Sequence, residues 1–91
     1  MPSRYELGKL YITPGASAVL EAPLSLLTRH AIGDWGELSN EDIRANERAI
    51  VEGTRILSAY TVDGQRIWII TEAVEDDGHR HATTILLASE Y

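Results

Sequence analysis

The dipeptide Asp63-Gly64 constrains the fold more than any other feature of this chain, because it separates two β-rich runs, residues 54–62 and 65–73. An Asp-Gly pair supplies the positive backbone angles of a two-residue hairpin turn, and this turn fixes the register of the strands on either side. We therefore predict an antiparallel hairpin, with Arg55 and Glu72 as a cross-strand ion pair. The register pairs Val62 with Gln65, Tyr60 with Ile67, Ser58 with Ile69, Ile56 with Thr71, Ala59 with Trp68 and Leu57 with Ile70.

Both faces of this hairpin carry apolar side chains. One face packs against helices, and the other is either covered by the chain itself or offered to a partner protein. Trp68 lies on the face opposite to Tyr60 and Ile67, so its exposure distinguishes between these two possibilities. An uncovered face also favours a homodimer.

Turn and capping residues predict the elements before the hairpin. Residues 7–12 form a short strand, after which Thr13 caps a brief helix that begins at Pro14. A second, amphipathic helix runs over residues 23–32, and its apolar spacing puts Leu24 on the packing face.

A third helix begins after Ser39 as its N-cap and ends at Gly53, and residues 82–88 form a last strand. The 91 residues suffice for one hydrophobic core. The sequence therefore predicts a single α+β domain over residues 1–91. Its expected order is a short N-terminal strand, then two to three helices packed on a three- to four-stranded antiparallel β-meander.

Composition argues against several classes of function. The net charge of −6 makes nucleic acid unlikely as the main ligand, because Lys and Arg supply most of the affinity for phosphate. The chain contains no cysteine, which suits a reducing cytoplasm, and no run approaches the ~18 apolar residues of a membrane span. We therefore expect a cytoplasmic protein with no membrane attachment, and we predict no cofactor.

The segment from Arg29 to Asn46, RHAIGDWGELSNEDIRAN, concentrates polar and aromatic side chains around two glycines. His30 falls in the last turn of its helix, where the helix dipole favours the protonated imidazole, and Asp34 follows four residues later. A general acid or base fits this position. We favour the alternative of a structural histidine, which satisfies backbone carbonyls at the helix end or pairs with Asp34.

Trp35 lies between Asp34 and Gly36. It either provides a stacking platform for a partner or folds back as a lid over the core, and we favour the lid. The candidate contact residues for a partner are Asp34, Trp35, Glu37, Asn46 and Trp68.

His79 and His81 stand beside Asp76 and Asp77, and on an extended chain the two imidazoles point to the same side. Together with a carboxylate, such a pair binds divalent metal ions. The dipeptide Asp77-Gly78 is a turn signal, however, and a solvated hairpin loop explains the segment better. We therefore predict no metal site here.

Several motifs carry a resemblance to other proteins: LxRHxxGDWGE, RxNE, GxRxLSAYxxxGxxIWIITEA and TTILLxxEY. They resemble a group of small, largely uncharacterised bacterial proteins found on plasmids, phages and chromosomes. Some of these are labelled plasmid-related or type I restriction endonuclease subunit M. The resemblance spans nearly the whole chain and implies association with a mobile genetic element. It does not imply methyltransferase activity, because the chain lacks the length and the glycine-rich cofactor motifs of such a subunit.

A looser resemblance concerns the layout of the elements. Helices with a terminal Arg-His, followed by a sheet with a Thr-rich last strand, are similar to small metal-independent ribonucleases of the barnase, colicin and toxin type. This resemblance implies a general acid or base, a phosphate clamp and a polar anchor around the scissile phosphate. The residues in these roles would be His30, then Arg29 or Arg44, then Thr83 or Thr84.

Three hypotheses for function therefore compete. The first, which we favour, is a noncatalytic interaction or regulatory protein of a mobile element, which binds a protein partner through the Trp35 loop or the open sheet face. The second is the ribonuclease-like enzyme with His30 as its acid-base group. The third is an acidic inhibitor that mimics nucleic acid. Its phosphate-like array would consist of Glu37, Glu41, Asp42 and Glu47.

Overall fold

The computed structural model describes residues 2–91, and it contains the hairpin that Asp63-Gly64 predicts. Strands β2 (Ile56–Val62) and β3 (Gln65–Thr71) pair antiparallel, and the six residue pairs of the predicted register are confirmed. Both turn residues have positive φ angles, 50° for Asp63 and 76° for Gly64, as this type of turn requires.

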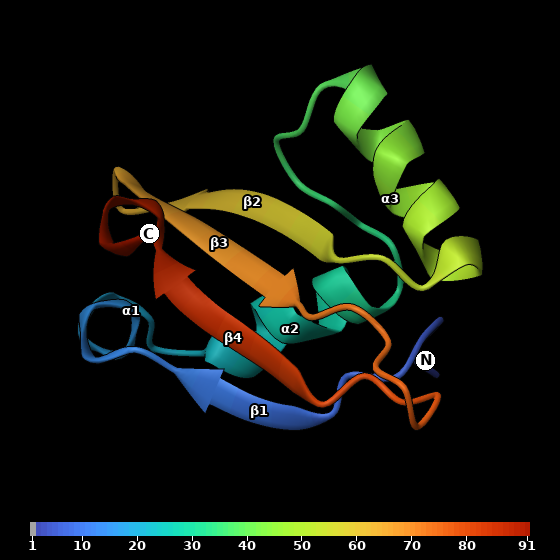
Figure 1. Ribbon diagram of the computed structural model, residues 1–91. Helices are drawn as coiled ribbons and strands as arrows, with labels where there is room; N and C mark the ends of the chain where they lie inside the picture. Colours follow the sequence, from blue (N-terminus) through green and yellow to red (C-terminus); the bar gives the residue numbers. More distant parts are fainter. Residues whose placement is uncertain (1) are drawn as a thin grey trace.

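Two further strands complete a four-stranded sheet of order β1-β4-β3-β2. β4 (Ala82–Leu87) runs antiparallel to β3, whereas β1 (Lys9–Ile12) runs parallel to β4 at the edge of the sheet. The α+β class and the N-terminal strand are confirmed. The sheet is mixed, however, and not the purely antiparallel meander that we expected, because the chain leaves β1 through helices and enters the sheet again at the opposite edge (Figure 1).

The helices begin and end close to where the capping residues place them. The Thr13 side chain accepts a hydrogen bond from Ala16 N at the start of α1 (Pro14–Val19). The Ser39 side chain caps α3 (Asn40–Glu52) in the same way, and Gly53 ends that helix with a φ of 82°. Within residues 2–91, no helix has both the length and the apolar character needed to cross a bilayer.

Helix α2 (Pro23–Ala31) is rotated relative to the sequence expectation. Leu24, expected on the packing face, is 68% exposed. The buried side of the helix instead carries Leu26, Leu27, His30 and Ala31. The stripe therefore includes a histidine among its apolar residues.

Helices α1 and α2 cover one face of the sheet and enclose the main core, whereas α3 lies beyond the edge formed by β2 (Figure 1). A smaller apolar cluster beneath α3 contains Trp35, Ala49 and Ile56. No helix lies over the opposite face of the sheet within residues 2–91 (Figure 1). The main core consists of Ala16, Leu20, Leu26, Leu27, Tyr60, Ile67, Ile69 and Ile85.

The expected ion pair between Arg55 and Glu72 does not form among the described residues. The β2–β3 ladder ends at the pair of Ile56 with Thr71, so the backbone no longer holds these two side chains opposite each other. Arg55 Nη1 instead donates a hydrogen bond to the Tyr91 hydroxyl at 2.7 Å.

Candidate functional site

His30 lies fully buried between α2 and the sheet. Its Nδ1 is 2.5 Å from Ser58 Oγ on β2, and its Nε2 is 2.8 Å from Thr71 Oγ1 on β3. Burial lowers the pKa of the imidazole to about 3, so the ring is neutral at pH 7. The expectation that the helix dipole keeps His30 protonated is therefore wrong, because the cost of desolvation outweighs the dipole.

The hydroxyl groups around His30 determine which nitrogen carries its proton. Thr83 Oγ1 donates to the Leu7 carbonyl at 2.7 Å, so it accepts from Thr71 Oγ1, which is 2.8 Å away. The hydroxyl of Thr71 has thus used its only proton, and it accepts from Nε2–H of His30. Nδ1 is then the acceptor for the Ser58 hydroxyl. Every polar side-chain atom in this row of hydrogen bonds has a partner, and none of the four side chains involved is exposed to solvent.

The other residues of the ribonuclease hypothesis do not join His30 in a cleft. Arg29 pairs with Asp34, with Nε 2.7 Å from Oδ2, and its guanidinium lies 4.7 Å from the centre of the Tyr60 ring. This ion pair lowers the pKa of the Asp34 carboxyl. Thr84 points to the sheet face opposite to Thr83, and Arg44 is exposed on α3. Only His30 and Thr83 share a network.

Trp35 is a lid over the smaller core and only 3% exposed. Its ring stacks on Tyr5 with centroids 6.1 Å apart and meets His30 edge-on at 5.9 Å. The indole nitrogen donates to Glu47 Oε2 at 3.1 Å, and Glu47 in turn pairs with Arg4. The aromatic face of Trp35 is therefore occupied by the protein itself.

The Trp35 loop also closes one edge of the sheet. The amide of Ala59 donates to the Trp35 carbonyl at 3.1 Å, and the amide of Glu37 donates to the Ala59 carbonyl at 2.7 Å. Gly36 has a φ of 75°, and a Cβ there would lie 2.1 Å from the Ala59 carbonyl oxygen. Only glycine fits this close approach.

Asn46 closes the same edge one step further along β2. Its Nδ2 donates to the Leu57 carbonyl at 2.6 Å, and its Oδ1 accepts from the Leu57 amide at 3.1 Å. A side-chain amide thus takes the place of a neighbouring strand. Sequence reasoning missed this role, because no spacing rule links a helix asparagine to a strand eleven residues away.

The four acidic residues of the inhibitor hypothesis lie near this edge, but they do not share one environment. Glu47 turns inward to Trp35 and Arg4, and its pKa is lowered by the hydrogen bond from Arg4. Glu37 is exposed on the loop, where its backbone binds β2. Glu41 and Asp42 occupy the first turn of α3, so the four carboxylates do not form one array.

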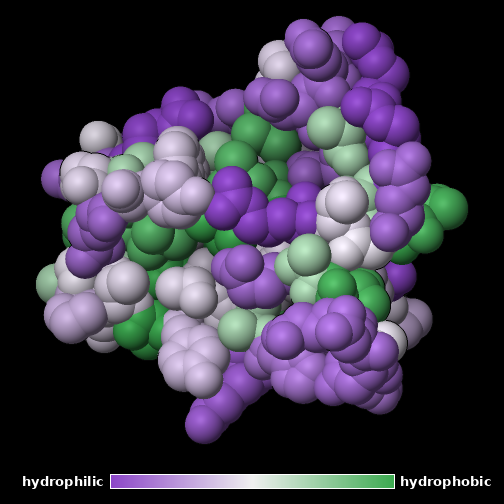
Figure 2. Space-filling view, in the orientation of Figure 1, coloured by the Kyte–Doolittle hydropathy of each residue, from purple (hydrophilic) through white to green (hydrophobic). Residues whose placement is uncertain are grey.

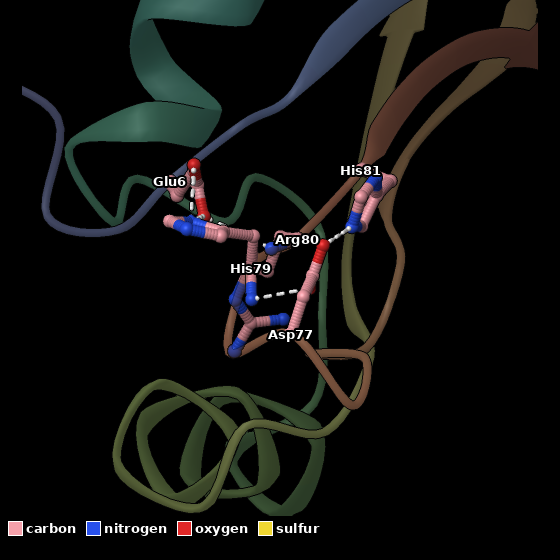
Figure 3. A network of polar contacts seen from close by, with 5 residues as sticks. All are labelled: Glu6, Asp77, His79, Arg80 and His81. Atoms are coloured by element: carbon pink, nitrogen blue, oxygen red, sulfur yellow. Dashed lines mark hydrogen bonds and ion pairs between the residues drawn. The ribbon is translucent and has the colours of Figure 1, made fainter.

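His79 and His81 lie on opposite sides of their loop (Figure 3). His79 Nδ1 is 3.2 Å from the Glu6 carboxylate, and His81 Nε2 is 2.7 Å from Asp77 Oδ2. Within residues 2–91 no three potential ligands are grouped to hold a metal ion.

The residue between them, Arg80, was not singled out by the sequence, yet it is only 4% exposed. Its guanidinium donates to the carbonyls of Ala49 at 2.9 Å and Thr54 at 2.7 Å, and to that of Glu72 at 3.0 Å. It therefore joins the end of α3 to the sheet.

The face of the sheet without helices is partly covered by its own side chains. Trp68 is half-buried, and the Tyr91 ring meets it edge-on with centroids 5.3 Å apart. Arg55 Nη1 donates a hydrogen bond to the Tyr91 hydroxyl, and Ile70, on the same face of β3 as Trp68, is only 4% exposed. Figure 2 shows apolar atoms near the middle of this face, surrounded by polar ones. Little apolar area is thus left open around Trp68.

At the other edge of the sheet, along β1, several exposed hydrophobic residues lie together. All four residues of β1 are exposed, with Leu10 at 50% and Ile12 at 40%. Leu10, Tyr11 and Ile12, together with residues of α2, line a groove of about 140 Å³, which we call the β1–α2 groove. Its lining residues are Leu10, Tyr11, Ile12, Pro23, Leu24, Leu27 and Ile85.

The backbone of β1 is open beside this groove. The amides of Lys9 and Thr13 donate to the carbonyls of His81 and Ile85, so these residues face β4. Because alternate residues of an edge strand point to opposite sides, the N–H and C=O groups of Leu10 and Ile12 point outward. No strand lies beyond β1 among residues 2–91 (Figure 1).

Comparisons with protein-family models, with curated proteins and with solved structures give no match. The resemblance to plasmid and phage proteins therefore stays a prediction.

Proposed function

We propose that this protein is a small noncatalytic interaction domain that binds an extended segment of a protein partner along the edge of β1. The observation that carries the proposal is an edge strand with outward backbone groups beside an exposed apolar groove. Edge strands of this kind pair with an added strand, whose side chains enter neighbouring pockets. Such binding needs no catalytic group.

The two binding surfaces expected from the sequence, the Trp35 loop and the open sheet face, leave fewer groups free to contact a partner. The aromatic face of Trp35 is buried, and the polar groups of Asn46 are engaged with β2. Trp68 is partly covered by Tyr91. The two edges of the sheet thus differ: β2 is closed by its own loop and helix, whereas β1 is open.

The groove defines the chemistry of the bound segment. Its lining is almost entirely aliphatic and aromatic, so alternate residues of the segment must be apolar. Its volume of about 140 Å³ accommodates one or two aliphatic side chains. Gly8 and Pro14 flank β1 and limit the paired length to a few residues.

The proposal includes the cellular compartment in which the protein binds its partner. The absence of cysteine suits a reducing compartment, so we propose that binding takes place in the cytoplasm. The resemblance of the sequence motifs supports a role in a bacterial mobile element.

Displayed random peptides, selected on the immobilised protein, test the proposal. We expect selected peptides to alternate apolar and polar residues, and to shift the amide resonances of Leu10 and Ile12 when titrated. Leu24→Lys, which places a charge in the groove, should abolish binding. Val51→Lys is the matched control, because Val51 is 86% exposed on α3, away from the groove.

Two results would overturn the proposal. One is the absence of any enriched peptide when the immobilised protein is monomeric, with the edge of β1 unoccupied. The other is binding that Leu24→Lys leaves unchanged, because the contact would then lie elsewhere on the protein.

A further inference from the structure

We infer that the segment paired along β1 is β1 of a second copy of this chain. This inference rests on the proposed function, because it names the partner for the same edge. Two sheets joined in this way form one continuous sheet through a twofold axis.

The outward backbone groups of β1 are complementary to themselves. In an antiparallel pair centred on Tyr11, Leu10 lies opposite Ile12 of the second copy, and Ile12 lies opposite its Leu10. Residues that face outward exchange both N–H···O bonds with the residue opposite. Leu10 and Ile12 are the residues of β1 whose N–H and C=O groups point away from β4. The pairing therefore satisfies both open positions at once.

The side chains match in the same register. Leu10 and Ile12 both point to the side of the sheet that carries α2, where Leu24 stands 68% exposed. The twofold axis places the two β1–α2 grooves side by side, and these apolar side chains cover one another. Tyr11, 49% exposed, meets its own copy on the opposite side of the sheet. Aromatic pairs across strands are favourable.

The charge distribution also favours a second copy. The chain carries 14 acidic residues, but residues 7–33 contain only one of them, Glu21. This range includes all of β1 and α2. Pairing through β1 therefore joins segments that contain almost no acidic residue of their own and keeps the acidic α3 helices apart, while Asp77 beside His81 and Glu90 beside Thr13 lie at the two ends of β1.

The net charge of the chain determines how dimerisation should depend on salt. Two chains of net charge −6 repel each other at long range, and salt screens this repulsion. Dimerisation through an apolar contact should therefore strengthen between about 0.01 and about 0.3 M salt, where the Debye length falls well below the size of the chain. A contact based on opposite charges would weaken instead.

Sedimentation equilibrium of the full chain, over a range of concentrations up to about 1 mM, tests the inference. We expect a mass of twice 10.1 kDa for the wild type at high concentration. Leu24→Lys and Ile12→Lys should each weaken dimerisation by about a hundredfold or more, because each removes an apolar side chain from both copies. Val51→Lys makes the same change in charge and should dimerise like the wild type. Leu10→Pro removes one outward N–H and leaves the β1–β4 ladder intact, so it too should yield monomer.

A dimer that both lysine variants in the groove leave intact would overturn the inference. A wild-type monomer at every concentration and salt would overturn it as well. If that monomer still binds displayed peptides along β1, only the second-copy inference fails. If it binds none, the proposed function fails with it.

Discussion

His30 Nε2 donates a hydrogen bond to Thr71 Oγ1 at 2.8 Å, and neither residue has any exposed surface. This bond joins α2 to β3 in the middle of the molecule. The imidazole thereby serves as a rigid, uncharged connector between the helix layer and the sheet. Its position explains why a helix that packs on the sheet includes a polar residue in its buried stripe.

Replacement of this histidine should destabilise the fold strongly. His30→Ala removes a buried ring and leaves the Ser58 and Thr71 hydroxyls without their partner, so we expect a loss of about 3–5 kcal/mol in the free energy of unfolding. Urea denaturation at pH 7 measures this change. His79→Ala is the control, since His79 is exposed, and it should cost less than about 1 kcal/mol. Similar losses in both variants would contradict a special role for His30.

Acid should destabilise the protein through the same residue. The pKa of His30 is lowered from its ordinary value of 6.5 to about 3 in the folded state, so below pH 6.5 only the unfolded chain takes up this proton. The free energy of unfolding therefore falls as the pH falls, by about 2 kcal/mol between pH 7 and pH 5. The carboxylates of Asp34 and Glu47 have lowered pKa values and titrate below this range.

Urea denaturation from pH 7 to pH 5, in a chain carrying His79→Gln and His81→Gln, isolates this effect. NMR of the His30 ring provides an independent measurement that needs no further variant. The ring resonances should stay constant down to about pH 4. A titration midpoint near pH 6 would show that His30 is accessible to protons in the folded state.

Local signals in the sequence predicted the elements well, whereas their arrangement depends on distant contacts. Asp63-Gly64 and the cap Ser39 act within a few residues, so the hairpin and α3 follow directly from them. The parallel pairing of β1 with β4 joins residues more than seventy positions apart, such as Lys9 and Ala82. No local rule selects this pairing over an antiparallel one.

The candidate site was harder to predict, because its polar side chains form hydrogen bonds within the protein itself. The spacing of apolar residues on α2 wrongly predicted that Leu24 is buried, because His30 was not counted among the residues of the buried face. Burial of His30 depends on hydroxyl partners 28 and 41 residues away, and these partners are invisible in the sequence pattern. The same helix rotation exposes Leu24 and creates the β1–α2 groove.

The amide of Asn46 should control the stability of the β2 edge. Asn46→Ala removes two hydrogen bonds to Leu57 and leaves its backbone groups without a partner, so we expect a loss of about 2–3 kcal/mol. Asn46→Asp should be almost as harmful, because a carboxylate cannot donate to the Leu57 carbonyl. Arg48→Ala, on the exposed side of the same helix, is the control. Hydrogen exchange should quicken at the Leu57 amide, and unchanged exchange there would refute the pairing.

Gly36 should be far less tolerant of a side chain than Gly78, although both have positive φ angles, 75° and 83°. Gly78→Ala meets nothing within 4 Å, so its cost is the backbone strain alone, about 1–2 kcal/mol. Gly36→Ala adds a Cβ 2.1 Å from the Ala59 carbonyl oxygen, and the backbone must move. We expect at least about 2 kcal/mol more destabilisation than in Gly78→Ala.

Urea denaturation of the two alanine variants measures this difference, and hydrogen exchange locates its origin. The strand edge should open in Gly36→Ala, so exchange should quicken at the amides of Glu37 and Ala59, which bond across this contact. The corresponding amides should stay protected in Gly78→Ala. Equal stability losses would mean that the loop shifts away from β2 at no cost. In that case the β2 edge, like β1, would be free to pair with another strand.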